Sequence, residues 1–251
     1  MPEERLIWFK GNLVPADQAL VPVLSPTAQF GLNIFEGLRG YWNPERGDVY
    51  IFRLDDHLDR LFQSCRLIGL RSPYSKNQIR DIVCETVRAN GYQTDVAVRV
   101  TLFVGEEGTW SSSEPVGMFV APIMKKRRDP RLQTGASACI STWERINDRA
   151  MPPRAKVGAN YINGRYAHLE AQRNGYDLPI LLDREGKVTE GAGSCICMVR
   201  KGVLITPPVT ASVLEGVTRD TLLVLAQRSG IPVLERQVDR SELLVADEVF
   251  L

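Results

Sequence analysis

Short apolar runs bounded by turn residues open the chain and predict β-strands. The runs cover residues 6–9, 33–42 and 49–53, and turn sequences such as Lys10-Gly11-Asn12 separate them. These three strands are expected to form an antiparallel sheet. A further strand is predicted at 96–104, where apolar residues alternate with others and Arg99 falls on the less apolar face. An arginine in that position is able to face a pocket.

Between these strands the apolar residues repeat at the spacing of a helix. From Leu54 to Ile68 they recur three or four positions apart, which predicts an amphipathic helix. A second helix is expected to begin at Ser75, because Ser75 and Gln78 have the spacing of a capping box, and to end at Gly91. Both helices are predicted to cover the sheet.

A basic, proline-containing stretch at residues 123–133 divides the chain. Such a charge run is more often a solvated connection than a phosphate site, so we interpret it as an interdomain linker. It separates a small N-terminal α+β domain at 1–122 from a larger C-terminal domain at 134–251. The C-terminal part mixes strands and helices, which gives an α+β or α/β fold class. Its predicted elements are strands near 136–143, 178–183 and 195–199 and helices at 161–174 and after Gly216.

Composition limits the partners and the compartment. The 251 residues contain 31 Lys and Arg against 30 Asp and Glu, so no global field draws the chain to nucleic acid or to an anionic membrane. The five cysteines are odd in number and are expected to be reduced thiols, which suggests a cytoplasmic protein. We find neither a targeting leader nor an apolar run of membrane-spanning length.

Three kinds of site are disfavoured by the residues present. A metal centre is not expected, because the only histidines, His57 and His168, lie on different predicted helices and Cys195-Ile-Cys197 lacks a second ligand pair. A serine hydrolase is discarded, because Gly191-Ala-Gly-Ser194 does not match a nucleophile elbow. The same glycines precede a strand, so they predict a tight turn instead of a dinucleotide site.

The residues that a phosphorylated aldehyde cofactor requires are present. Such a cofactor needs an amine to form an imine, a carboxylate at the ring nitrogen, a donor to the phenolic oxygen and an anion cradle. Lys156 lies just before a predicted helix among small neighbours that leave room for a flat ring, although a lysine there is more often solvent-exposed. The backbone N–H groups of Val217 and Thr218 begin the helix after Gly216, where an anion binds favourably.

An ordered series of motifs covers nearly the whole chain. With this series the chain resembles the class IV, pyridoxal-phosphate-dependent aminotransferases, and the branched-chain amino acid type most of all. The motifs are Phe30-Gly-Leu-Asn-Ile-Phe-Glu-Gly-Leu-Arg-Gly-Tyr41, Phe52-Arg-Leu-Asp-Asp-His-Leu-Asp-Arg-Leu61, Ala155-Lys-Val-Gly-Ala-Asn-Tyr161, Gly175-Tyr-Asp177, Leu181-Leu-Asp183, Val188-Thr-Glu-Gly-Ala-Gly193, Leu204-Ile-Thr-Pro-Pro208 and Leu214-Glu-Gly-Val-Thr-Arg-Asp220.

The resemblance implies a role for each cofactor-binding residue. Lys156 would form the Schiff base with pyridoxal 5′-phosphate and would move the proton between the substrate and the cofactor. Glu190 would keep the pyridine nitrogen protonated, because a carboxylate favours a nearby positive charge. Tyr161 would donate to the phenolic oxygen. The phosphate would be bound by the guanidinium of Arg60 and by the helix start at Val217 and Thr218.

The resemblance also suggests a substrate site for an apolar amino acid. Phe35, Gly37 and Arg39 match the Phe-Glu-Gly-x-Arg pattern of branched-chain enzymes, and Arg99 matches the arginine on the strand bordering the substrate. Two positions depart from the group, since Phe30 and Ala97 stand where it usually presents tyrosines. A Ser-Cys pair also follows the glycine turn in place of a usual Glu-Asn pair. Lost polar groups weaken substrate positioning and allow a changed amino donor.

The leading hypothesis is therefore a transaminase that moves the amino group of an L-branched-chain or similar apolar amino acid to 2-oxoglutarate. The alternatives are a D-amino acid or amine transaminase, an aminodeoxychorismate lyase, or a non-catalytic relative. The family normally continues beyond Leu251 with a Gly-Thr turn, so we interpret the chain as shortened at its C-terminus. The resemblance implies two domains with the cofactor at their junction and a homodimer or higher homo-oligomer. It leaves the exact donor, acceptor and pathway open.

Overall fold

A computed structural model describes residues 5–127 and 131–251 of the chain. Its contacts divide the chain into two compact units. Unit 1 contains residues 1–132 and 155–159, and unit 2 contains 133–154 and 160–251. The chain therefore enters unit 2, returns to unit 1 for five residues around Lys156, and leaves again at Ala159. The predicted division assigned these five residues to the C-terminal domain, so the two divisions differ there.

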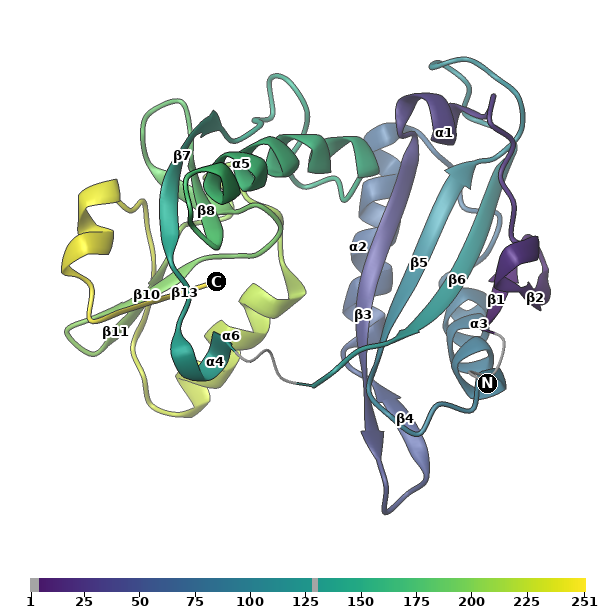
Figure 1. The fold of residues 1–251 in the computed structure, drawn as a ribbon, viewed down its shortest axis with the longest axis horizontal. Coiled ribbons are helices and arrows are strands. Elements are labelled where there is room, and N and C mark those ends of the chain that lie inside the picture. The colour runs from purple at the N-terminus through teal and green to yellow at the C-terminus, as the bar shows by residue number, and fades with distance from the viewer. Residues whose placement is uncertain (1–4, 128–130) are drawn as a thin grey trace. The chain divides into compact units, whose positions relative to one another are not determined.

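Unit 1 is built on one antiparallel sheet (Figure 1), as the alternating runs predict. The strand order is β2-β1-β6-β5-β3-β4, and β3 pairs with β5 over eight residue pairs from Asn33–Phe103 to Gly40–Val96. This register places Gly37 opposite Arg99. The strands are β1 (Leu6–Phe9), β2 (Asn12–Pro15), β3 (Asn33–Asn43), β4 (Asp48–Ile51), β5 (Val96–Val104) and β6 (Val116–Met124).

Two helices cover one face of this sheet. Helix α2 (Leu54–Ile68) packs on β3, and α3 (Lys76–Ala89) packs on β1, β4, β5 and β6, both on the same side in Figure 1. The capping box predicted at the start of α3 is present, with Ser75 and Gln78 each accepting from the other's backbone N–H. Apolar residues from α2, α3 and the sheet, among them Leu58, Ile79 and Ile34, form the core.

Unit 2 contains two smaller sheets. One has the order β12-β11-β10-β13 and the other β7-β8-β9, and each combines parallel and antiparallel pairs. The strands are β7 (Ala138–Glu144), β8 (Leu178–Leu182), β9 (Val188–Gly191), β10 (Cys197–Arg200), β11 (Val203–Thr206), β12 (Val233–Glu235) and β13 (Glu248–Phe250). The mixed α/β fold that the sequence predicts is confirmed.

Two longer helices pack against these sheets. Helix α5 (Tyr161–Arg173) lies on β7 and β8, and α6 (Val217–Arg228) contacts β12. Glycine ends α5 as predicted, because Gly175 has a φ of 79° that other residues rarely adopt. The cores contain residues such as Ile196 and Met198 in one cluster and Leu204 and Leu223 in the other.

Several short elements have no counterpart among the predictions. They are β2, β9, β11, β12 and β13, the helices α1 (Pro26–Phe30) and α4 (Arg131–Thr134), and the 3-10 turns Ala16–Gln18, Gly158–Asn160 and Arg240–Val245.

In the predicted linker, β6 continues to Met124 and Arg127 binds Asp95 of unit 1 at 2.7 Å. Within the described part of the chain, no helix combines the length and the apolarity needed to cross a membrane.

Candidate functional site

Unit 1 fixes the main chain of Lys156 from both sides. The N–H of Lys156 donates to the hydroxyl of Ser64 on α2 at 2.9 Å, and its carbonyl accepts from the N–H of Phe35 on β3 at 3.0 Å. The next residue, Val157, forms a bridge with Ile34. Strand β3 and helix α2 therefore determine where the Lys156 side chain starts.

An aromatic ring lies beneath two cationic side chains beside that main chain. The Nζ of Lys156 is 5.0 Å from the centroid of the Phe35 ring, and the guanidinium carbon of Arg99 is 4.3 Å from it. Gly37, opposite Arg99 on β3, has open space where a Cβ would stand. The structure thus brings together Lys156, Phe35, Gly37 and Arg99, which the sequence analysis proposed for catalysis and substrate binding.

Arg60 is buried in unit 1 and is not a solvated helix arginine. Its Nε donates to one carboxylate oxygen of Glu36 at 2.8 Å, and its Nη2 donates to the other at 2.7 Å. The Nδ1 of His57 lies 2.8 Å from the same carboxylate. Glu36 comes from β3 and the other two residues come from adjacent turns of α2, so the helix–sheet contact assembles the cluster.

The charge state of Glu36 follows from these contacts. Burial alone would raise the pKa of its carboxyl, but hydrogen bonds from Arg60 and His57 and the charges of Arg60 and Lys156 lower that pKa below its usual value. Glu36 is therefore ionised at neutral pH. The sequence analysis quoted Glu36 within a motif and gave it no role, because its partners are 21 and 24 residues away.

The contacts of two other predicted substrate residues, Arg39 and Phe30, involve other parts of unit 1. Arg39 donates from Nη2 to the carbonyl of Lys126 at 3.0 Å, and its guanidinium lies over the Tyr41 ring at 5.7 Å. Phe30 ends the short helix α1, and 47% of its surface is exposed.

Glu190 in unit 2 is also a buried carboxylate with a cationic partner. Its Oε1 lies 2.6 Å from a guanidinium nitrogen of Arg145, and its Oε2 accepts from the N–H of Leu214 at 3.1 Å. Both ion-paired side chains are less than a tenth exposed. The Nε of Arg145 is buried without a hydrogen-bond partner within the described chain. No motif in the sequence points to Arg145, so it was missed.

Tyr161 lies beside the glycine turn that follows Glu190. A Cβ on Gly193 would contact the Tyr161 ring at 3.7 Å, and a Cβ on Gly164 would collide with the carbonyl oxygen of Ala192. The absence of these side chains lets α5 pack directly on the turn. Unit 2 therefore brings Tyr161 and the Glu190–Gly193 segment together.

Val217 and Thr218 form the first turn of α6, as predicted. Gly216 is its N-cap and provides no side-chain acceptor for the first N–H groups of the helix. These N–H groups and the positive end of the helix dipole favour an anion. Thr218 is exposed and Val217 is buried, so in this turn the backbone N–H groups are the feature suited to an anion.

Comparison with known proteins identifies the family. A family model for amino-transferase class IV matches residues 33–251. The branched-chain-amino-acid aminotransferase of Escherichia coli K12 is 35% identical over 98% of this chain and 80% of its own length. A probable branched-chain-amino-acid aminotransferase of Aquifex aeolicus is 33% identical over 97% of this chain and 79% of its own length.

Solved structures give the same result. The branched-chain aminotransferase of Thermoproteus uzoniensis with norvaline has a TM-score of 0.92 and 39% identity, over 98% of this chain and 82% of that one. The holo-form enzyme of Thermobaculum terrenum, which contains PLP, has a TM-score of 0.91 and 40% identity over 100% of this chain and 82% of that one. The chain belongs to the class IV aminotransferases. Members of this family depend on pyridoxal phosphate.

The residues present fit this cofactor. A protonated pyridine nitrogen needs an ionised carboxylate, and Glu190 is held by a buried arginine that stabilises the charged form. A carboxylate oxygen can accept more than one hydrogen bond, so a contact with Arg145 or Leu214 does not by itself exclude a further donor. The amine of Lys156, the phenol of Tyr161, the guanidinium of Arg60 and the start of α6 complete the required set of groups.

Proposed function

We propose that the protein transfers the amino group of a branched-chain L-amino acid to 2-oxoglutarate. The observation that carries the proposal is the fixed main chain of Lys156 beside the Phe35 ring and Arg99. The names of the relatives, all branched-chain aminotransferases, support the choice of substrate. Neither a D-amino acid or amine transaminase nor a non-catalytic relative is favoured.

Lys156 is the proposed catalytic residue. Pyridoxal phosphate supplies an aldehyde that takes up the amino group and a ring that withdraws electrons from the substrate's α-carbon. Lys156 would hold the cofactor through its Nζ, and once the substrate's amino group has replaced it there, the freed amine would act as the general base for the proton on the substrate's α-carbon. The hydrogen bonds at the backbone N–H and carbonyl of Lys156 limit where Nζ can reach, which favours the enantiomer whose α-proton faces that amine.

Four other features are proposed to hold the cofactor. Glu190 would accept a hydrogen bond from the protonated ring nitrogen, with Arg145 keeping its carboxylate ionised and oriented. Tyr161 donates its hydroxyl hydrogen to the phenolic oxygen. Arg60 binds the phosphate with its guanidinium, and the first N–H groups of α6 bind it with their dipoles.

The open face of the unit 1 sheet provides the proposed substrate contacts. The Phe35 ring offers an apolar surface for the branched side chain of the donor. The Arg99 guanidinium, which lies over that ring, suits the second carboxylate of 2-oxoglutarate. An apolar donor and a dianionic acceptor can therefore use the same surface in turn. Gly37, without a side chain, leaves the space beside Arg99 open.

The assembly and the compartment are further parts of the proposal. We expect a homodimer that works in the cytoplasm. The large exposed apolar side chains of unit 1, with Val23 80% exposed and Trp110 76% exposed, support an interface with a second copy. Light scattering of the purified protein measures the mass directly, and a value near 28.1 kDa, the mass of one chain, would contradict the dimer.

A substrate panel tests the proposed reaction. The full chain with added pyridoxal phosphate and 2-oxoglutarate should form glutamate from L-leucine, L-isoleucine and L-valine, and should not form it from D-leucine or a simple amine. Lys156→Ala should form none. Glutamate production from D-leucine or the amine in place of the L-amino acids would overturn the proposed substrate class, and lack of production from every donor would overturn the transaminase.

A further inference from the structure

Glu36 is a completely buried carboxylate at the centre of three cationic or titratable side chains. Its side chain has no exposed surface, and it contacts Arg60 and His57 directly. Lys156 is close enough for its charge to lower the pKa of Glu36. Nothing in the proposed reaction requires a carboxylate here, since Glu190 serves the ring nitrogen. A buried charge that has no reaction role calls for another explanation.

The geometry around Glu36 fixes the orientation of Arg60. The Nε and Nη2 atoms of Arg60 donate to separate carboxylate oxygens at 2.8 and 2.7 Å, which is the two-pronged arrangement of a planar guanidinium and a carboxylate. Two parallel hydrogen bonds define both the plane and the direction of the guanidinium. His57 contacts the carboxylate at 2.8 Å and so limits rotation of the carboxylate itself.

Holding Arg60 in one orientation favours anion binding, and this gain offsets the positive charge that the Glu36 carboxylate cancels. A neighbouring carboxylate lowers the net positive charge that a phosphate meets. However, an arginine that is already oriented loses little side-chain freedom when an anion binds, and a buried guanidinium without a partner would be strongly unfavourable. Because both groups are buried, the pair also persists in salt that would screen an exposed one.

We propose that Glu36 is a positioning residue for the phosphate of the cofactor, acting through Arg60. The inference rests on the proposed function, in which Arg60 binds that phosphate. It predicts that Glu36 matters only for ligands that carry the phosphate. A purely structural Glu36 would instead affect every ligand of the site equally, because it would act on the packing of α2 against β3.

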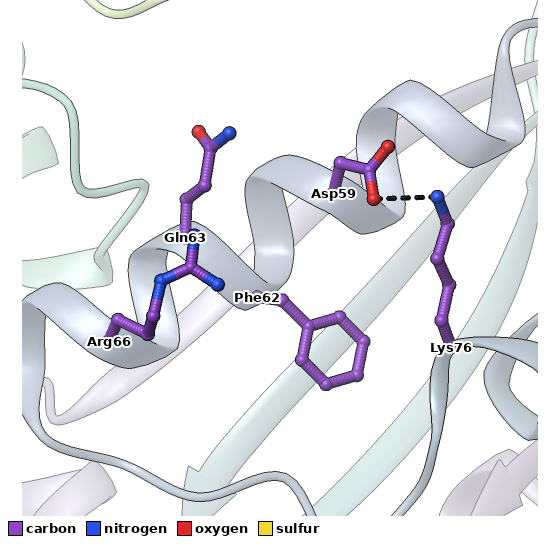
Figure 2. Close-up of a pocket in the computed structure, with 5 residues that line it drawn as sticks. All are labelled: Asp59, Phe62, Gln63, Arg66 and Lys76. Atoms are coloured by element: carbon purple, nitrogen blue, oxygen red, sulfur yellow. Dashed lines mark hydrogen bonds and ion pairs between the residues drawn. The ribbon is translucent and has the colours of Figure 1, made fainter.

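Pyridoxal phosphate and pyridoxal, which lacks the phosphate, separate these two roles. The experiment measures the dissociation constants of both ligands for the full-length wild type, for Glu36→Gln and for a matched control, using their absorption change. The control is Asp59→Asn, which removes a carboxylate of α2, the helix that contains Arg60, from its 2.6 Å ion pair with Lys76. Figure 2 shows that pair. Both residues line a pocket with a volume of about 330 Å³.

Glu36→Gln is expected to weaken pyridoxal phosphate binding about 10- to 100-fold, by analogy with the loss that follows removal of a residue that orients a metal ligand. Its pyridoxal dissociation constant should stay near the wild-type value, and Asp59→Asn should change neither constant. An equal loss for both ligands, or no loss for pyridoxal phosphate, would overturn the positioning role.

Removing Glu36 alone leaves a buried arginine charge, so Glu36→Gln risks failing to fold. The double variant Glu36→Gln/Arg60→Gln removes both charges of the pair, and Arg60→Gln is the single variant with which it is compared. If Glu36 acts through Arg60, the double variant binds pyridoxal phosphate as weakly as Arg60→Gln alone. A further phosphate-specific loss in the double variant would contradict the inference. A wild type without Lys156-dependent binding of pyridoxal phosphate would overturn the proposed function, on which this inference rests.

Discussion

The backbone N–H of Lys156 donates to the side-chain hydroxyl of Ser64, 92 residues earlier in the chain, at 2.9 Å. Ser64 is fully buried and lies one helical turn after Arg60 on α2. A single helix therefore contains both the residue that anchors the proposed catalytic lysine and the arginine proposed to bind the phosphate. The spacing between the anchored Lys156 main chain and Arg60 therefore depends on the rigidity of helix α2.

Ser64→Ala should reduce both stability and turnover. The substitution leaves the Lys156 N–H without its acceptor, and a buried unsatisfied donor costs about 1–3 kcal/mol. We expect the free energy of unfolding in urea to fall by that amount and turnover of L-leucine to fall by up to about 100-fold, as for a catalytic group displaced by about 1 Å. Ser111→Ala, an exposed serine of unit 1, is the control and should change neither. Unchanged turnover in Ser64→Ala would show that the anchor is dispensable.

Glu190→Gln should separate the structural and chemical roles of that carboxylate. The amide does not keep the ring nitrogen protonated, so turnover should fall, and the buried Arg145 loses its ion-pair partner at a cost of about 3–5 kcal/mol.

The double variant Glu190→Gln/Arg145→Met removes the unpaired charge of the single variant. It should recover most of the free energy of unfolding while turnover stays low. Recovery of turnover together with stability would mean that Glu190 acts only through folding.

The stability that the Asp95–Arg127 ion pair provides at the start of the predicted linker should be lost at low pH. Hydrogen bonds from Arg127 and from the Trp42 N–H lower the pKa of Asp95 from 3.8 to about 2, although burial alone would raise it. Because the pKa is lower in the folded state, the stabilisation is present above about pH 3.8 and is lost as the pH falls toward 2.

Asp95→Asn removes this contribution. Its urea midpoint should lie below that of the wild type at pH 7, and the difference should shrink between pH 4 and pH 2, where Asp95 of the wild type becomes protonated. A difference that is independent of pH over this range would contradict the assigned role of the Asp95–Arg127 pair.

Gly164→Ala should disturb the contact between α5 and the glycine turn. The added methyl group would collide with the carbonyl oxygen of Ala192, and overpacking of this kind costs about 1–3 kcal/mol even though alanine favours a helix. Thermal unfolding measures the loss. Arg165→Ala on the same helix has an exposed side chain and should be close to neutral. A Gly164→Ala protein as stable as the wild type would mean that the turn moves freely.

Strong local patterns account for the elements that the sequence predicts well. Helices α2 and α3 and strands β3 and β5 have long apolar repeats, and the Ser75 capping box marks the start of α3. Strands such as β11 and β12 are only four and three residues long, and they are defined by pairing with one another. Segments of this length do not carry enough alternation to be recognised before the chain folds.

The site shows the same division between local and long-range information. Motifs name Lys156, Tyr161, Glu190 and Arg60 directly. Ser64, Glu36 and Arg145 become visible only in the fold, because each acts on a partner more than twenty positions away. The return of residues 155–159 to unit 1 has the same cause, since β3 and α2 supply the partners of Lys156.

The visible absorption spectrum of the purified chain with pyridoxal phosphate tests the central role of Lys156 most directly. The wild type should show a visible band that decays when L-leucine is added and returns when 2-oxoglutarate follows. Lys156→Ala, at equal concentration and with an unchanged unfolding midpoint, should lack that band. A band of equal intensity in Lys156→Ala, or a wild-type band that L-leucine leaves unchanged, would contradict the account.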